Sequence, residues 1–274
     1  MALVTTDIDF LRSTIAQRSG NVISADHSYL LESRLAPVAQ SAGLADVRAL
    51  VAELRTDAQT LLHDKVTEAM TINETSFFRD IQPFDALKDH VLPDLVEKRA
   101  SMRSLSIWSG ASSSGQEAYS IAIAIRTYFP QLNDWSVRIL GTDLSQEMVQ
   151  RTVDGVYSQF EVNRGLPASL LVRSFDRKGL NWQVKPELRG LVEARKMNLT
   201  ENWSTVAQHD VVFLRNVLIY FDVKIKERIL KRVHQSMRPG GYLFLGGGET
   251  LIQLNVPFER VTIGKTVCFR PVSK

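Results

Sequence analysis

Only one cysteine, Cys268, occurs in the 274 residues of this chain. A single thiol excludes an intrachain disulfide, and so little cysteine is typical of a cytoplasmic protein. Its apolar neighbours Val267 and Phe269 predict a buried strand, which gives Cys268 weak support as a nucleophile. The first residues also lack the basic and apolar regions of a secretory signal. We therefore expect a cytoplasmic location.

Long apolar runs are absent too, and none approaches the length of a membrane span. The histidines show no metal-ligand spacing, so we expect no metal site. Dense basic runs and aromatics interleaved with arginine are missing, so we do not expect a nucleic-acid partner. Residues 1–72 hold six Lys or Arg and nine Asp or Glu, so the net charge of +3 leaves +6 on residues 73–274. That charge favours an acidic partner for the second part.

Residues 1–72 have helical periodicity and no convincing strand pattern. A first helix is predicted with Asp7 or Asp9 as its cap and Gly20 at its end. Further helices are predicted over about 28–40, 46–55 and 57–70. We predict an all-helical N-terminal domain over 1–72 that covers a larger domain over 73–274.

The stretch from Ser104 to Phe129 organises the second part. Residues 104–109 alternate as in a strand, 110–117 are small or polar between two glycines, and 118–129 have a helical apolar face. Such a loop exposes backbone N–H groups and a helix N-terminus to a polar or anionic ligand group. The spacing of Gly110 and Gly115 does not match G-x-G-x-x-G, and no phosphate-loop lysine follows, which argues against a nucleoside triphosphate. An ordinary strand-to-helix connection is the alternative.

A second predicted strand, 136–143, ends in Asp143, and Ser145 can cap a helix over 146–154. An acidic residue at this position holds the ribose hydroxyls in dinucleotide-type folds, because a carboxylate accepts from both. The alternative is a charge that interacts with the dipole of the next helix.

A third predicted strand, 211–214, is continuously apolar, and Arg215 and Asn216 follow it. Because ligands bind beyond the carboxyl ends of parallel strands, we expect Asp143, Asn198 and Asn216 to converge on the loop 110–117.

The remaining segments are less regular. Residues 71–80 are predicted to form the lip of a cleft, or else a linker in which Asn73 or Thr75 caps the next helix. A helix over 83–98 is predicted to kink or end at Pro93. Residues 157–190 hold an insertion, with short strands 181–184 and 191–195 joined across 185–190. After a helix over 222–237, a turn over 238–241 leads to strands over 242–245, 257–263 and 266–271.

Five stretches taken in this order resemble the CheR family of S-adenosylmethionine-dependent chemoreceptor glutamate methyltransferases. They are Asn-Glu-Thr-Ser-Phe-Phe-Arg (73–79), Trp-Ser-Gly-Ala-Ser-Ser-Ser-Gly-Gln-Glu-Ala-Tyr-Ser-Ile-Ala (108–122), Gly-Thr-Asp-Leu-Ser (141–145), Arg-Asn-Val-Leu-Ile-Tyr-Phe (215–221) and Pro-Gly-Gly-Tyr-Leu-Phe-Leu-Gly (239–246). One departure is Gly247-Gly248-Glu249, where the family usually has a serine before the glutamate.

The resemblance implies an α/β fold, a Rossmann-like class I methyltransferase domain with a small inserted antiparallel β subdomain, preceded by the all-helical domain. It implies S-adenosylmethionine as cofactor, S-adenosylhomocysteine as product, and glutamate side chains on the cytoplasmic helices of methyl-accepting chemotaxis receptors as methyl acceptors. The implied cofactor-site residues are Asn73, Thr75, Arg79, Glu117, Asp143, Asn198, Leu199, Arg215 and Asn216.

Glutamate is ionised at pH 7, so its methylation needs no general base, and no obvious nucleophile–base pair stands in the chain. We expect Arg79 or Arg215 to hold a carboxylate of cofactor or substrate, and Tyr220 to lie beside the reactive methyl group. Two alternatives stay open: a methyltransferase with another acceptor, and a non-catalytic S-adenosylmethionine sensor.

Overall fold

The computed structural model describes residues 3–24, 29–56, 61–203 and 207–272. Within them, one compact unit comprises the chain up to Ile72 with Tyr220–Lys226, and the other comprises Asn73–Ile219 with the chain from Glu227. In the described part of the chain, no helix combines the length and the apolar character needed to cross a membrane.

The first unit is helical, as predicted. Its helices are α1 (Thr5–Ser19), α2 (Tyr29–Ser41), α3 (Val47–Leu54) and α4 (Leu61–Ala69). Their apolar faces meet in a core that includes Leu11, Ile15, Leu31, Leu35 and Leu50. The predicted starts at 28 and 57 lie outside the described residues.

The predicted N-cap of α1 is wrong, whereas the predicted end of the helix at Gly20 is right. Val4 is the N-cap and no side chain caps the helix, because the Asp7 carboxylate contacts Arg48 and Arg55 instead. Gly20 ends the helix in the left-handed conformation, with φ of 74°.

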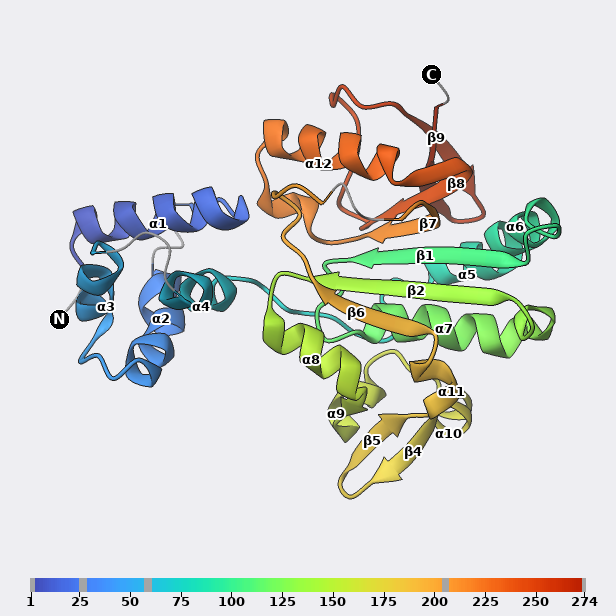
Figure 1. Ribbon diagram of the computed structural model, residues 1–274, viewed down its shortest axis with the longest axis horizontal. Coiled ribbons are helices and arrows are strands. Elements are labelled where there is room, and N and C mark those ends of the chain that lie inside the picture. The colour runs from blue at the N-terminus through green and yellow to red at the C-terminus, as the bar shows by residue number, and fades with distance from the viewer. Residues whose placement is uncertain (1–2, 25–28, 57–60, 204–206, 273–274) are drawn as a thin grey trace. The chain divides into compact units, whose positions relative to one another are not determined.

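The second unit is built on a seven-stranded sheet of order β6-β2-β1-β7-β8-β10-β9 (Figure 1). Strands β6, β2, β1, β7 and β8 are parallel, and β10 is antiparallel to both β8 and β9. The strands are β1 (Ser104–Gly110), β2 (Ser136–Asp143), β6 (Val192–Lys196), β7 (His209–Leu214), β8 (Met237–Leu245), β9 (Phe258–Ile263) and β10 (Thr266–Pro271). Strand β8 begins before the predicted turn over 238–241, because His209 pairs with Met237.

Both faces of the sheet are covered. Ile107 points into a core with the helix α7 (Gln116–Tyr128), whereas the next residue, Trp108, packs against Trp203 with ring centroids 5.1 Å apart. The predicted helix over 83–98 forms as α5 (Gln82–Ala86), a π-helical turn (Leu87–Val91) and α6 (Leu92–Lys98). Pro93 lacks the N–H that would continue an α-helix through this turn. Helices α8 (Gln146–Asp154) and α12 (Val223–Gln235) match their predictions.

The insertion carries a three-stranded antiparallel sheet, β3-β5-β4, from Val156–Tyr157, Asn181–Val184 and Phe175–Lys178. Short helices α9 (Gln159–Asn163), α10 (Ala168–Ser174) and α11 (Pro186–Arg189) accompany it. The strands predicted over 181–184 and 191–195 both form, and they belong to different sheets. Strand β5 pairs with β3 and β4, whereas β6 extends the large sheet beside β2.

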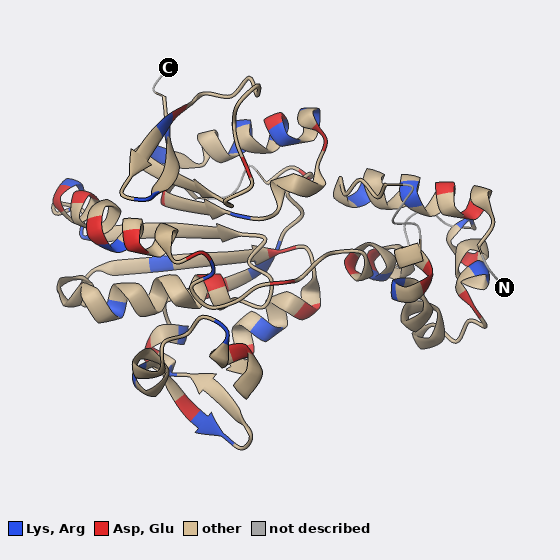
Figure 2. Cartoon of the chain, turned by 180° about the vertical axis from the view of Figure 1, so that it is seen from behind, with Lys and Arg blue, Asp and Glu red and all other residues tan. Residues whose placement is uncertain are grey.

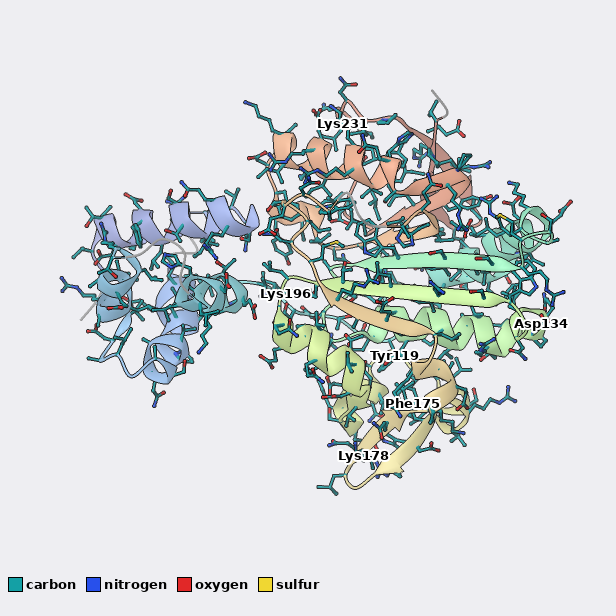
Figure 3. All side chains as sticks on the ribbon, in the orientation of Figure 1. Tyr119, Asp134, Phe175, Lys178, Lys196 and Lys231 are labelled. Carbon is teal, nitrogen blue, oxygen red and sulfur yellow. The ribbon has the colours of Figure 1, made fainter. Side chains whose placement is uncertain are left out.

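Aromatic side chains attach the insertion to the main sheet domain. Tyr157 packs edge-on against Tyr119 of α7, at 6.2 Å between centroids, and against Phe175 of β4 at 6.3 Å. Figure 3 labels Tyr119 and Phe175 on these two elements. Phe77 contacts both Tyr157 and Phe175, so the segment before α5 is part of the same core.

Candidate functional site

The chain order of the sheet reverses direction between β1 and β7. From β1 the chain moves outward to β2 and β6, then returns to β7 on the other side of β1. The loops after β1 and β7 therefore lead in opposite directions at the carboxyl edge, which is where ligands bind in open α/β sheets. Residues 111–115 and the pair Arg215-Asn216 occupy these two positions.

The loop after β1 is formed by close backbone packing. Gly115 has φ of 90°, and a Cβ there would lie 2.7 Å from Thr152. A Cβ on Gly110 would lie 2.9 Å from Leu214. The hydroxyls of Ser113 and Ser114 bond to Asn73 O and Gln116 Oε1. The loop thus holds its small side chains inward and leads directly into the N-terminus of α7.

Asp143 ties this loop to β2. Its Oδ2 accepts from Ser113 N at 2.8 Å and its Oδ1 from Ser145 N at 2.9 Å. Ser145 caps α8, so the carboxylate also stabilises the start of that helix. The predicted contact of Asp143 with the cofactor stays a prediction.

Arg215 is the centre of a charged cluster with Glu117 and Asp80. Its Nη1 lies 2.9 Å from Glu117 Oε2 and its Nη2 lies 2.8 Å from Asp80 Oδ2. Nη2 also donates to the carbonyl oxygen of Arg79, and Ser109 Oγ donates to Glu117. Among the described residues, the buried Nε of Arg215 has no partner. The arginine is thereby held between two carboxylates of the protein itself.

The segment 73–80 lies along the loop and α7. Ser113 Oγ donates to Asn73 O, and Phe78 N donates to Ser120 Oγ at 2.9 Å. Arg79 is half-buried, and its Nη1 donates to Glu74 O. Helix α5 starts only at Gln82 with Ile81 as N-cap, so the alternative in which Asn73 or Thr75 caps it is wrong. Thr75 is half-buried in this segment.

Two further predicted residues follow β6. Met197 N donates to Asp143 O, which brings the start of this loop to the end of β2. Asn198 Oδ1 accepts from the N and Oγ1 of Thr200, and the Leu199 carbonyl accepts from Trp203 Nε1. Asn198 therefore shapes a tight turn, while Leu199 is buried next to it. Of the two, Asn198 is the more accessible.

Tyr220 ends the 3-10 helix Leu218–Tyr220, which follows Asn216 in the chain, and is half-buried. It is grouped with the first unit. Its role beside the methyl group remains a prediction.

Glu249 is a residue that the sequence reasoning missed. Its carboxylate accepts from five backbone N–H groups, those of Gly246, Asn216, Val217, Leu218 and Ile219, at 2.7–3.3 Å. A Cβ on Gly246 would lie 2.8 Å from both Asn216 Nδ2 and Glu249 Oε2. Glu249 thus positions the loop after β7. An acidic residue three positions after a glycine that ends a buried strand was the signal available in the sequence.

Backbone strain gathers in the same loops. Residues other than glycine with positive φ cost energy and are concentrated at functional sites. Of the seven in the described chain, five lie in these segments: Phe78, Asp80, Ala111, Ser113 and Asn216. The packing and hydrogen bonds above hold them there.

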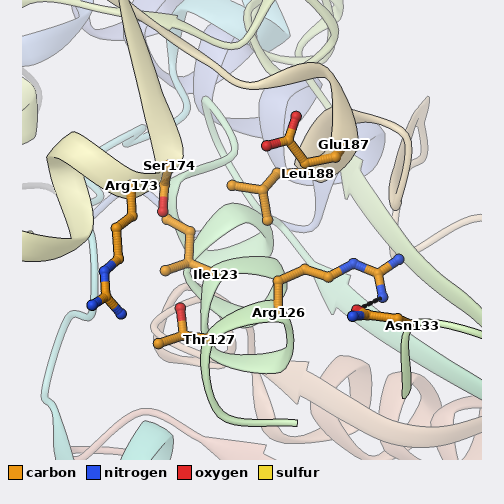
Figure 4. A pocket seen from close by; sticks show the side chains of 8 residues that line it. All are labelled: Ile123, Arg126, Thr127, Asn133, Arg173, Ser174, Glu187 and Leu188. Atoms are coloured by element: carbon orange, nitrogen blue, oxygen red, sulfur yellow. Dashed lines mark hydrogen bonds between the residues drawn. The ribbon is translucent and has the colours of Figure 1, made fainter. Parts of the chain in front are cut away.

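A cavity of about 390 Å³ lies at the carboxyl edge of the second unit, beside Asp80, Gly246 and Glu249. Another, of about 540 Å³, lies away from the loop 111–115, around the C-terminal half of α7 (Figure 4). In it Arg126 is bonded to Asn133. Figure 2 shows Lys and Arg spread among Asp and Glu over the chain, without a continuous basic stripe.

The residues at the carboxyl edge fit S-adenosylmethionine. The cluster of Glu117, Asp80 and Arg215 carries one net negative charge, which suits a cationic ligand group such as a sulfonium or ammonium. Arg79 has no ion pair with a described residue and suits the carboxylate. In the described part of the chain, no group of three or more His, Cys, Asp or Glu could hold a metal ion.

Comparison with known proteins finds similarity over nearly the whole chain. A family described as "CheR methyltransferase, SAM binding domain" matches residues 73–267, and one described as "CheR methyltransferase, all-alpha domain" matches residues 6–71. The chain is 39% identical to chemotaxis protein methyltransferase 1 of Pseudomonas aeruginosa, over 98% of this chain and 99% of the other. It is 37% identical to chemotaxis protein methyltransferase Cher2 of Pseudomonas putida with the same coverage. It is also 37% identical to chemotaxis protein methyltransferase 1 of Vibrio cholerae, over 96% and 95% of the two chains.

Proposed function

This chain belongs to the CheR methyltransferase family, and on that basis we propose that it methylates glutamate side chains of chemoreceptors with S-adenosylmethionine as the methyl donor. The product would be a glutamate methyl ester, which makes the chain a protein-glutamate O-methyltransferase. The observation that carries the proposal is the likeness to chemotaxis methyltransferases over nearly the whole of both chains.

The site chemistry supports this acceptor. A glutamate carboxylate is already ionised at neutral pH, so the reaction needs no base to remove a proton. One carboxylate oxygen forms a bond to the methyl carbon while the sulfur–methyl bond breaks, and its electron pair stays on the sulfur of S-adenosylhomocysteine. Catalysis then depends on orienting the two reactants and excluding water, for which rigid loops are sufficient.

Within the cofactor site we assign different roles to the two arginines. Arg215 is paired with Glu117 and Asp80, so we propose that it positions these carboxylates toward the cationic end of the cofactor. Arg79 donates only to a backbone carbonyl among the described residues, so we propose that it holds a carboxylate of cofactor or substrate. Asp143 would accept from the ribose hydroxyls, and Asn198 and Leu199 would line the cofactor site.

The remaining assignments follow from the same proposal. Tyr220 would lie beside the methyl group, and Asn73, Thr75 and Asn216 would complete the wall of the site. The protein would act in the cytoplasm and reach the membrane only through the receptors. No nucleic-acid partner is proposed.

The experiment that tests the function is transfer of radiolabelled methyl from S-adenosylmethionine to membranes that contain chemoreceptors. Methyl esters release methanol in mild alkali, whereas N-methyl and C-methyl products do not. We expect base-labile label on receptors and none on receptor-free membranes. An Asp143→Ala variant should transfer less because its cofactor affinity falls.

Two results would contradict the proposal. Base-stable label would indicate a different acceptor. Cofactor binding in calorimetry without any transfer to receptors would favour the sensor function.

A further inference from the structure

The cavity at the carboxyl edge is lined by Asp80, which contacts Arg215, and by Glu249, which contacts the loop after β7. It is enclosed by the end of β8 with the loop to Thr250, by the start of β10, and by residues 80–83. Because β10 is antiparallel to β8 and Cys268 pairs with Phe244, Thr266 reaches the level of the β8 carboxyl end. The turn between β9 and β10 therefore borders the edge at which Arg215 and Asn216 end β7.

The cavity contains two acids and two cations, but only the acids have partners. Asp80 is paired with Arg215, and Glu249 accepts from five backbone N–H groups. Arg260 and Lys265 line the cavity, are exposed, and have no carboxylate within ion-pair distance among the described residues. Arg260 and Lys265 are thus the two charged groups of the lining that have no ion pair with a described residue.

The rest of the lining is suited to an acidic side chain with an aliphatic stem. Leu245, Val267 and Phe269 provide apolar surface beside the two cations. A volume of about 390 Å³ accommodates a few side chains and is too small for a folded element. A glutamate fits such a cavity, because its methylenes contact the apolar floor while its carboxylate meets the cations.

We propose that this cavity binds a second carboxylate of the methyl-acceptor segment, and that Arg260 and Lys265 thereby select which glutamates are methylated. The inference rests on the proposed function and names its substrate class: helical segments with an acidic residue three or four positions from the acceptor. On a helix these positions lie on one face, with Cβ atoms about 5–6 Å apart. One carboxylate enters the reaction site while its neighbour occupies the cavity.

The test is a double-mutant cycle between enzyme and acceptor. The enzyme variant is Arg260→Gln with Lys265→Gln, and the control is Arg228→Gln, an exposed arginine of α12 outside the cavity. The acceptors are a purified cytoplasmic receptor fragment and versions in which acidic residues three or four positions from each methylated glutamate are changed to glutamine.

We expect the double variant to raise KM for the unmodified fragment roughly five- to tenfold, as for two partly exposed charge contacts. Its kcat and its dissociation constant for S-adenosylmethionine should stay unchanged. The KM of the wild-type enzyme should rise by a similar factor on the modified fragment. The KM of the double variant should rise little further when the fragment is modified. The difference in KM between wild type and the double variant should shrink at high salt, since the charges are partly exposed.

Several results would overturn the inference. Equal KM values for wild type and the double variant on every fragment would overturn the inference, and the proposed function would stand because methyl transfer still occurs. A changed cofactor affinity would place the two residues in the cofactor site instead. Competitive inhibition by inorganic phosphate that depends on Arg260 and Lys265, without any change in acceptor preference, would indicate a site for a small anion. If wild-type enzyme methylates no receptor fragment, the proposed function falls and this inference falls with it.

Discussion

Nη1 of Arg215 lies 2.9 Å from Oε2 of Glu117, and the arginine side chain is 1% exposed. The same guanidinium also reaches Asp80, so one buried cation joins the end of β7, the start of α7 and the segment before α5. A buried ion pair is costly to break, because each remaining charge is left without compensation. The pair therefore makes the geometry of the cofactor site part of the stability of the fold.

Arg215→Met should lower the free energy of unfolding by about 3 kcal/mol, since it leaves the largely buried Glu117 carboxylate without its partner, whereas Asp80 is half exposed and remains hydrated. Adding Glu117→Gln should recover part of that loss but not cofactor binding. Denaturant unfolding and calorimetry measure the two effects, and Arg228→Met is the control. Unchanged stability of Arg215→Met would show that the ion pair does not hold these segments together.

Glu249→Gln should destabilise the loop after β7, because an amide presents only one acceptor oxygen to five N–H donors. Hydrogen bonds to a charged group contribute about 1.5–3 kcal/mol, so a loss of about 2 kcal/mol is expected. Cofactor affinity should fall as well, since Asn216 moves with the loop. Glu259→Gln, an exposed change on β9, should affect neither quantity. Thermal unfolding without S-adenosylmethionine measures the loss of stability, and the additional stabilisation by S-adenosylmethionine measures the loss of cofactor affinity.

Gly115→Ala should cost more than Gly179→Ala, although both glycines have positive φ. A Cβ on Gly115 meets Thr152 at 2.7 Å, whereas one on Gly179 meets nothing within 4 Å. Gly179→Ala should therefore lose only the conformational cost of about 1–2 kcal/mol. In a Thr152→Ala background the two nearest atoms are gone, so Gly115→Ala should cost less there than in the wild type, with Thr152→Ala alone as the reference. Equal losses for the two single variants in denaturant unfolding would contradict the packing argument.

Stability should fall in mild acid because of His209. Burial lowers the pKa of His209 from 6.5 to about 4, with Arg238 also lowering it and the Asp210 charge opposing them. Its Nδ1 faces Ser106 Oγ, its ring lies beside Trp108, and its Nε2 has no partner in the described chain. Below pH 6.5 the unfolded chain binds a proton that the folded chain excludes, so stability decreases between pH 6.5 and 4.

The full effect of His209 is about 3 kcal/mol at pH 4, at 1.36 kcal/mol per pKa unit. His209→Gln removes this titration, so the difference in unfolding free energy between wild type and variant should narrow or reverse over that range. A difference that is independent of pH would contradict the assignment. Chemical denaturation from pH 4 to 8 provides the measurement.

Much of the fold was predictable from local pattern. Strands β1 and β2, helices α7, α8 and α12, and the hairpin of β9 and β10 match their predictions, because apolar period, glycines and caps lie close together in the chain. Pairing between distant strands was not predictable in the same way. Apolar and polar residues alternate over 191–195, which fits an edge strand of either sheet. Only the packing beside β2 decides the strand with which they pair.

The candidate site divides in the same manner. Asp143, Asn198 and Asn216 follow recognisable strands, so they were expected to converge on the loop 110–117, and Asp143 accepts from Ser113 N of that loop. The residues that accept hydrogen bonds from the Arg215 guanidinium could not be predicted, since one of them, Asp80, is 135 residues away in the chain. Glu249 was overlooked because its five partners are backbone groups, which have no signature in the sequence.

The sequence by itself determined the helical first part, the strand–loop–helix units and the family motifs, because these depend on residue type at short spacing. The tertiary structure decided which charged groups have partners: Asp80 pairs with Arg215, and Glu249 accepts from backbone N–H groups. Among the described residues, it left Arg260 and Lys265 beside the cavity without an ion pair. Pairing depends on distance in space and on burial, and a linear order of residues specifies neither.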